Sequence, residues 1–310
     1  MTTKSRLLAG SIGKTFVPPV ALALQTDGRL RLDDRIQTWL GEESWFERLP
    51  NGHDITLSHL LSHSSGLTDH VYDERYAETA RQRRETPGVD PDDSMSREDL
   101  VTFVLDKEPL FPAGEGFHYT DTGYILAGLV IELASERTFY EEVRHRFLDP
   151  LDLHRTDPSD RRSLEGLVAG YCGEQFTSWP EKMAENGVMA YNPASECTGG
   201  GFVSNSQDLV PWVKELYEGR VLDFPYLDDL LESGYRGADA ERTYGLAVYH
   251  FDDPPGRRIG HGGYFPGYNS SMYYFPAPKI AVAVQINSSD GNLRGPVMAG
   301  IAEVALAAAE

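Results

Sequence analysis

The sequence predicts an α+β fold in which a mainly helical lobe packs on an antiparallel sheet with flanking helices. Residues 11–195 read mainly as helices, whereas after the run Gly199–Gly201 the chain changes to β-branched and aromatic segments separated by Pro and Gly turns. Helices followed by a late run of strands indicate an α+β layout. We expect a single domain over 1–310, with the helical lobe at 11–195 and the sheet plus a C-terminal helix at 196–310.

Composition supports a globular chain and excludes several partners. The 310 residues are 40% hydrophobic and 25% charged, which is enough apolar content for a buried core. Asp and Glu number 48 against 28 Lys and Arg, giving a net charge of −20. Such a surface repels phosphate backbones and anionic lipid, so we expect no nucleic-acid partner and no membrane partner.

Several segments of the helical lobe carry sequence patterns that predict a helix or a loop. Ser96 followed by Asp99 resembles a capping box and starts one of the helices. The stretch Arg84–Ser96, with Pro and Gly among acidic residues, predicts a surface loop. The predicted helices are Leu57–Leu61, Arg97–Leu105 and the strongly apolar Thr122–Ser135.

The last third predicts a meander of strands. The run Ile280–Ile286 is largely apolar and alternates, as a buried antiparallel strand does. A helix over Pro296–Ala309 closes the chain. The strands are predicted at Tyr244–Phe251, Arg258–His261, Asn269–Phe275 and Ile280–Ile286.

The first motif with chemical content is Ser11-Ile12-Gly13-Lys14. At the start of a helix, Ser11 and Lys14 lie one turn apart on one face, and a lysine can take the proton of a serine hydroxyl when its ammonium form is disfavoured. The plainer alternative is an N-cap serine followed by a solvated lysine. A phosphate-binding loop is excluded because the glycine that it needs at position 8 is Leu8.

Two further motifs follow in chain order. Tyr119-Thr120-Asp121 stands just ahead of the apolar helix, where a phenol beside a cation can exchange protons. His261-Gly262-Gly263 ends a short predicted strand, where glycines let a substrate lie against the strand edge. Read alone, the tyrosine is a packed loop residue and the glycines are a turn.

Together these motifs resemble the serine β-lactamase-related family, which includes class C β-lactamases, D-Ala-D-Ala carboxypeptidases and family VIII esterases. The family's S-x-x-K matches Ser11–Lys14, its Y-x-N matches Tyr119–Asp121, and its K/H-x-G matches His261–Gly263. The similarity covers nearly the whole chain. It includes LSHLLSHSSGL (57–67), PAGEGFHYTDTGYILAGLVIE (112–132) and TGGGFVSNSQDL (198–209).

The resemblance implies a β-lactamase/transpeptidase-like fold and an acyl-enzyme mechanism. Ser11 would attack a carbonyl, and Lys14 and Tyr119 would share the proton shuttle. The backbone amides of Ser11 and Tyr264 would form the oxyanion hole, and no cofactor is needed. The residues expected to bind substrate or its oxyanion are Asp121, His261, Gly263 and Tyr264.

Two departures from the family pattern favour esters over amides. Asp121 replaces the asparagine of Y-x-N, and an ionised carboxylate only accepts hydrogen bonds. It favours the ammonium form of Lys14, which weakens that lysine as a base, and it cannot donate to a substrate amide. His261 stands where many members have lysine, and a neutral imidazole attracts a substrate carboxylate less.

Two other departures concern the fold. Pro18-Pro19 falls where the nucleophile's helix should continue, which predicts a kink. Only ten residues precede Ser11, whereas the family has a helix and two strands there, so we expect the N-terminal strands to be missing. We therefore expect an uncovered sheet edge, which a homodimer could cover.

The expected function is that of a serine hydrolase acting on a small-molecule ester, amide or D-amino-acid peptide, with esterase activity favoured. An acyltransferase using the same acyl-enzyme and a catalytically inactive binding protein are the alternatives. His59 and His63 have helical spacing but no third ligand, so no metal is expected. As given, the N-terminus has no signal peptide and predicts a cytoplasmic protein, or a periplasmic or secreted one if the sequence is truncated.

Overall fold

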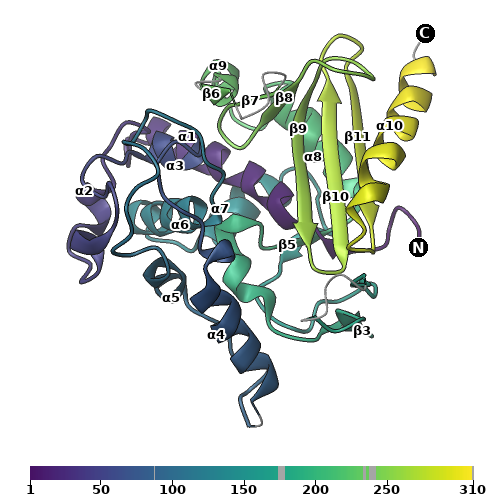
Figure 1. Cartoon of the computed structure of the whole chain (residues 1–310). Coiled ribbons are helices and arrows are strands. Elements are labelled where there is room, and N and C mark those ends of the chain that lie inside the picture. Colours follow the sequence, from purple (N-terminus) through teal and green to yellow (C-terminus); the bar gives the residue numbers. More distant parts are fainter. Residues whose placement is uncertain (87, 174–178, 233–234, 237–241, 309–310) are drawn as a thin grey trace.

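The computed structural model describes residues 1–86, 88–173, 179–232, 235–236 and 242–308. Helices gather on one side of the molecule and the main antiparallel sheet lies on the other (Figure 1). Both the predicted fold class and the predicted β-lactamase/transpeptidase-like architecture are confirmed.

The main sheet is antiparallel throughout, in the order β11-β10-β9-β8-β7-β6, with β11 at one edge among the described residues. Helices α8 (Ser206–Tyr217) and α10 (Gly291–Ala307) cover its two faces. Alternation along β11 explains both contacts, because Val282 packs with α10 while Ala283 belongs to the main core. The strands are β6 Tyr235–Arg236, β7 Arg242–Tyr244, β8 Tyr249–Phe251, β9 Arg258–Phe265, β10 Tyr268–Phe275 and β11 Ile280–Ile286.

The helical lobe is built around α6 (Asp121–Ser135), whose residues are buried on most sides. It contacts α1, α3 and α5, as well as the short helix η5. The α-helices of this lobe are α1 Val17–Thr26, α2 Gln37–Leu40, α3 Leu57–Leu61, α4 Glu74–Glu85, α5 Arg97–Thr102 and α7 Phe139–Val143, and α9 Leu227–Leu231 lies beside the sheet.

Short elements connect the two parts. Strand β5 (Phe202–Ser204) pairs with β1 (Leu7–Leu8) and with β2 (Asp157–Pro158), while β3 (Ala184–Glu185) pairs with β4 (Val188–Met189). The single-turn and 3₁₀ segments are η1 Gly10–Phe16, η2 Phe46–Arg48, η3 His70–Tyr72 and η5 Pro193–Gly199, and η4 Arg144–Leu148 is a π-helix.

Several predicted elements are confirmed and others are corrected. The bounds of α3 and β11 are as predicted, and Ser96 and Asp99 form the predicted capping box. The predicted strand Tyr244–Phe251 is wrong as one unit: the chain turns after Tyr244, with Ala247 at φ 54°, and this turn separates β7 from β8. Strand β9 does not end at His261 but runs on to Phe265.

The observed helices lie where they were predicted, but their ends differ from the predicted ends. Helix α5 ends at Thr102 rather than Leu105, and α10 begins at Gly291 rather than Pro296. Helix α4 extends to Glu85, two residues into the predicted loop. Pro87 of that loop and Ala309 at the predicted C-terminal helix end lie outside the described residues.

The structure has a change of helix type directly ahead of Pro18-Pro19, where the sequence predicts a kink. The chain enters through η1, and α1 begins at Val17, so both prolines lie in the first turn of the α-helix. Backbone N–H groups in a first turn have no intrahelical acceptor, so proline costs little there. Within the described part of the chain, no helix combines the length and apolarity that crossing a bilayer requires.

Candidate active site

Ser11 lies on η1, which is held against strand β9 by glycines. A Cβ atom on Gly10, whose φ is 55°, would lie 2.7 Å from the backbone nitrogen of Tyr264. A Cβ atom on Gly263 would lie 1.9 Å from the carbonyl oxygen of Ala9. The two backbones therefore lie too close together to leave room for a Cβ atom at either glycine. This close approach brings the backbone of Tyr264 next to Ser11.

Lys14 is fully buried directly behind Ser11. Residues three apart eclipse each other in a 3₁₀-helix, so the spacing of the motif aligns the two side chains. The Nζ atom of Lys14 donates to Ser11 Oγ at 3.1 Å and also to the carbonyl oxygen of Gly199, and it forms an ion pair with Asp121 Oδ1. Two hydrogen bonds and one ion pair thus place three oxygens around the Nζ atom, which as an ammonium group has three N–H donors.

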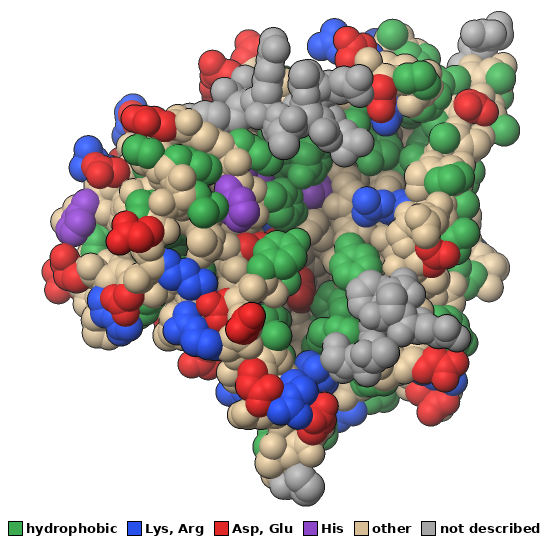
Figure 2. Space-filling model, viewed as in Figure 1, with side chains coloured by type: hydrophobic (Ala, Val, Ile, Leu, Met, Phe, Trp, Pro, Cys, Tyr) green, Lys and Arg blue, Asp and Glu red, His purple; other side chains and the backbone are tan. Residues whose placement is uncertain are grey.

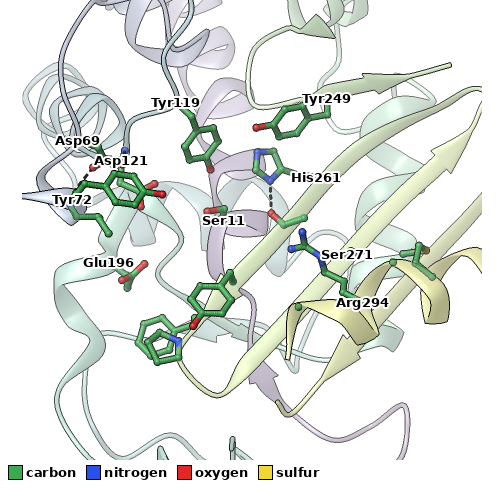
Figure 3. A pocket seen from close by; sticks show the side chains of 18 of the residues that line it. Ser11, Asp69, Tyr72, Tyr119, Asp121, Glu196, Tyr249, His261, Ser271 and Arg294 are labelled. Carbon is green, nitrogen blue, oxygen red and sulfur yellow. Dashed lines mark hydrogen bonds between the residues drawn. The ribbon is translucent and has the colours of Figure 1, made fainter. Parts of the chain in front are cut away.

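Tyr119 stands at the entrance to α6, and its hydroxyl points toward Ser11 (Figure 3). Among the described residues this buried hydroxyl has no hydrogen-bond partner of ordinary geometry. Burial raises the pKa of Tyr119 well above its usual value, and the charge of Asp121 adds to this. Tyr119 is therefore a neutral phenol in the resting site, where it can donate a proton.

His63 supports Tyr119 and was not assigned a site role from the sequence. Its ring centroid lies 4.0 Å from that of Tyr119, and its Nδ1 accepts a hydrogen bond from the backbone N–H of Thr120 at 3.1 Å. Burial lowers the pKa of His63 well below its usual value, and Lys14 adds to this, so the ring is neutral. The available signal was its position in the family-like text at 57–67.

His261 is buried in β9 and is also neutral. Its Nδ1 lies 2.6 Å from the carbonyl oxygen of Gly262, so this nitrogen donates, and its Nε2 accepts from the hydroxyl of Tyr244 at 3.0 Å. Burial, with Lys14 nearby, lowers the pKa of His261 to about 3. The imidazole therefore supplies no positive charge to a substrate at neutral pH.

Two carboxyl groups beside Asp121 were not found from the sequence. Asp69 is buried and its Oδ2 accepts the backbone N–H of Asp121 at 3.0 Å. Burial and the charge of Asp121 raise the pKa of Asp69 to about 7, and the same two causes raise the pKa of Glu196 to about 8. Three carboxyl groups, those of Asp69, Asp121 and Glu196, are therefore crowded on one side of Lys14. Asp69 and Glu196 come from separate segments, and neither belongs to a motif.

These side chains surround a cavity of about 1150 Å³ between the helical lobe and the sheet. The molecular surface is hollowed there (Figure 2). Ser11, Tyr119, Asp121, His261 and Tyr264 line the cavity, whereas Lys14 and Gly263 are not among its lining residues. Arg294 of α10 lies on the opposite side from Asp69 and Glu196 (Figure 3). In the described ranges, no three His, Cys, Asp or Glu side chains are grouped so that they could hold a metal ion.

Comparison with known proteins gives a consistent result. The sequence profile of the family described as Beta-lactamase matches residues 1–307. Penicillin-binding protein 4* of Bacillus subtilis is 23% identical over 281 residues, which cover 88% of this chain but 58% of that protein. This chain therefore spans less than two thirds of the length of that relative.

Solved structures show the same architecture. A D-stereospecific amidohydrolase from a Streptomyces species is 26% identical, with a TM-score of 0.79 and coverage of 92% of this chain and 83% of that one. A D-amino acid amidase from Ochrobactrum anthropi, complexed with D-phenylalanine, is 24% identical, with a TM-score of 0.75 and coverage of 99% and 94%.

Proposed function

The chain belongs to the beta-lactamase family, and from this premise we propose that it is a serine hydrolase that forms an acyl-enzyme on Ser11. The observation that carries the proposal is the 3.1 Å contact between Lys14 Nζ and Ser11 Oγ beside a large open cavity. A hydroxyl beside a buried amine is the arrangement that activates a serine without a histidine base.

Each neighbouring group has a step in this reaction. The Oγ atom of Ser11 attacks the substrate carbonyl while its proton passes to the Lys14–Tyr119 pair. The backbone amides of Ser11 and Tyr264, brought together by Gly10 and Gly263, stabilise the oxyanion. The phenol of Tyr119 protonates the leaving group, and water then attacks the acyl-enzyme and releases the acid.

We propose carboxylic esters as the faster substrates and small amides, including those of D-amino acids, as slower ones. An alkoxide or phenoxide leaves with less need for protonation than an amine does, and Asp121 in its ionised form offers no donor to an amide carbonyl. The neutral state of His261 does not help to bind a carboxylate. The amidohydrolase and the amidase among the solved relatives support amides as part of the range.

Intact-mass analysis with a fluorophosphonate probe tests this proposal. We expect one adduct on the wild-type chain and none on Ser11→Ala. Hydrolysis of p-nitrophenyl acetate should be lost with the adduct, and D-alanine p-nitroanilide should be cleaved more slowly than the ester. A folded wild-type chain without an adduct, or an adduct that persists in Ser11→Ala, would contradict the assignment of the nucleophile.

A further inference from the structure

The resting geometry at Lys14 raises a problem for its use as a base. Its Nζ atom contacts three acceptors, namely Ser11 Oγ, the Gly199 carbonyl and Asp121 Oδ1. An ammonium group has three N–H donors and no lone pair, so this arrangement suits the protonated lysine. Before Lys14 can take the proton of Ser11, one of its own protons must leave.

We propose that Asp121 is the acceptor of that proton, so that Ser11, Lys14 and Asp121 act in series; this rests on the proposed function. One N–H bond of Lys14 breaks and an O–H bond forms on Asp121, which leaves a neutral amine and a neutral acid. Rotation about the Cε–Nζ bond then presents the amine lone pair to Ser11. As the Ser11 Oγ–carbon bond forms, the serine proton moves to Lys14. After Tyr119 has protonated the leaving group, its phenolate takes a proton from Lys14, and Asp121 returns its own proton to Lys14, which restores the resting ion pair.

Contact and access favour Asp121 for this role. Its Oδ1 forms the ion pair with Lys14, and no hydrogen bond of ordinary geometry reaches this buried oxygen from the described residues. The Lys14 side chain is 0% exposed and that of Asp121 is 22% exposed toward the cavity that it lines. A bound substrate covers that remaining surface and removes water, which makes separated charges more costly than the neutral pair.

Two further carboxyls lie beside Asp121. Burial and the charge of Asp121 raise the pKa of Asp69 and of Glu196, so both hold a proton more readily than an exposed carboxyl does. Asp69 also holds the carboxylate in place by accepting its backbone N–H. The titratable groups around this carboxylate are Lys14 on η1, Asp69 before η3, His70 and Tyr72 on η3, Tyr76 on α4, Tyr119 before α6, Glu196 on η5 and His261 on β9.

The substitution Asp121→Asn separates this role from a purely electrostatic one. In the proposed series, the wild-type site works with one proton shared between Lys14 and Asp121, so activity is lost only when this pair takes a second proton at low pH. Asparagine cannot accept a proton, and the variant needs an unprotonated Lys14. For p-nitrophenyl acetate we therefore expect the acidic limb of kcat/KM to move to higher pH, with at least about a tenfold loss at pH 7.

The opposite shift would overturn the proposal. If Asp121 only stabilised the ammonium form of Lys14, its removal would help the lysine lose a proton, and the acidic limb would move to lower pH. An unchanged profile would also overturn it. Asp33→Asn, at an exposed ion pair with Arg31, is the matched control and should leave the profile unchanged.

Two measurements keep the test decisive. Fluorophosphonate labelling of the wild type at Ser11 shows separately whether the proposed function holds, so a labelled enzyme with the wrong pH shift contradicts only the proton series. If Asp121→Asn does not fold, Asp69→Asn replaces it, because asparagine can still accept the Asp121 N–H. We expect that variant to react about threefold to tenfold more slowly, and an unchanged rate would contradict the proposal.

Discussion

The ring of His63 packs on the ring of Tyr119 at a centroid distance of 4.0 Å, while its Nδ1 accepts the N–H of Thr120, the next residue along the chain. One side chain thus fixes both the face of the tyrosine ring and the backbone that carries it. Because the imidazole is neutral, it does so without adding charge beside Lys14. The orientation of the Tyr119 hydroxyl toward Ser11 depends on this contact.

Replacing His63 with alanine should therefore damage both stability and chemistry. The buried Thr120 N–H would lose its acceptor, which costs about 1–3 kcal/mol, and Tyr119 would lose its packing surface. We expect a lower urea midpoint and slower labelling of Ser11. His53→Ala, at an exposed histidine, is the control and should change neither. Wild-type labelling in a destabilised His63→Ala chain would show that Tyr119 does not need this support.

Lys14→Met removes the amine and keeps a long apolar stem. Because proton transfer by a positioned group contributes about 10²–10⁴-fold, we expect the rate of Ser11 phosphonylation to fall by that range. Stopped-time intact-mass measurements give this rate directly. Lys107→Met, which breaks a more exposed ion pair with Asp73, serves as the control. Equal labelling rates in the wild type and Lys14→Met would mean that the lysine does not activate the serine.

Gly263→Ala should push strand β9 away from η1 and so disrupt the active site. The added Cβ would lie 1.9 Å from the Ala9 carbonyl oxygen and 2.4 Å from Ser270 Oγ, so β9 must move away from η1. Overpacking of this kind costs about 1–3 kcal/mol or more, and the oxyanion amides would separate. Gly300→Ala is the matched change: no described atom lies within 4 Å of its Cβ, and a helical glycine replaced by alanine gains about 0.5–1 kcal/mol. Thermal unfolding and ester hydrolysis together check both expectations.

The pH dependence of the free energy of unfolding should reflect the titration of Asp69 and Glu196. The folded-state pKa is about 7 for Asp69 and about 8 for Glu196, in both cases above the ordinary value, so the folded protein holds protons that the unfolded chain releases. Their contribution to the free energy of unfolding therefore falls as pH rises from about 4, the ordinary carboxyl range, to about 8, and it levels off above that pH. His261 has a pKa of about 3, so its contribution to the free energy of unfolding rises with pH instead. This opposite effect is confined to pH values below about 6.5.

Glu196→Gln isolates one of these carboxyls. The amide does not titrate, so we expect a shallower decline of unfolding free energy between pH 6.5 and 8 than in the wild type. Urea titrations at four or five pH values give the two slopes. Glu85→Gln, at an exposed ion pair with Arg81, provides the comparison. Parallel slopes for the wild type and Glu196→Gln would show that Glu196 is already ionised across this range.

The fold class and the motif residues could be predicted from the sequence because their signals are local. The i, i+3 spacing of Ser11 and Lys14 and the alternation in Ile280–Ile286 each lie within a few residues. Asp69 and Glu196 gave no such signal, because their relation to Asp121 exists only after three distant segments meet. In the same way, Gly262 and Gly263 read as a turn, although they continue β9 where the backbone of Ala9 leaves no room for side chains.

The start of α6 has a consequence for how the site assembles. Among the described residues, Thr120 forms no side-chain cap, because its hydroxyl donates to the Thr68 carbonyl, and the first N–H of the helix is accepted instead by Asp69, 52 residues earlier. The helix cannot complete its own first turn from local sequence. The position of Asp121, and with it the ion pair to Lys14, therefore depends on the docking of the segment at η3 against the start of α6.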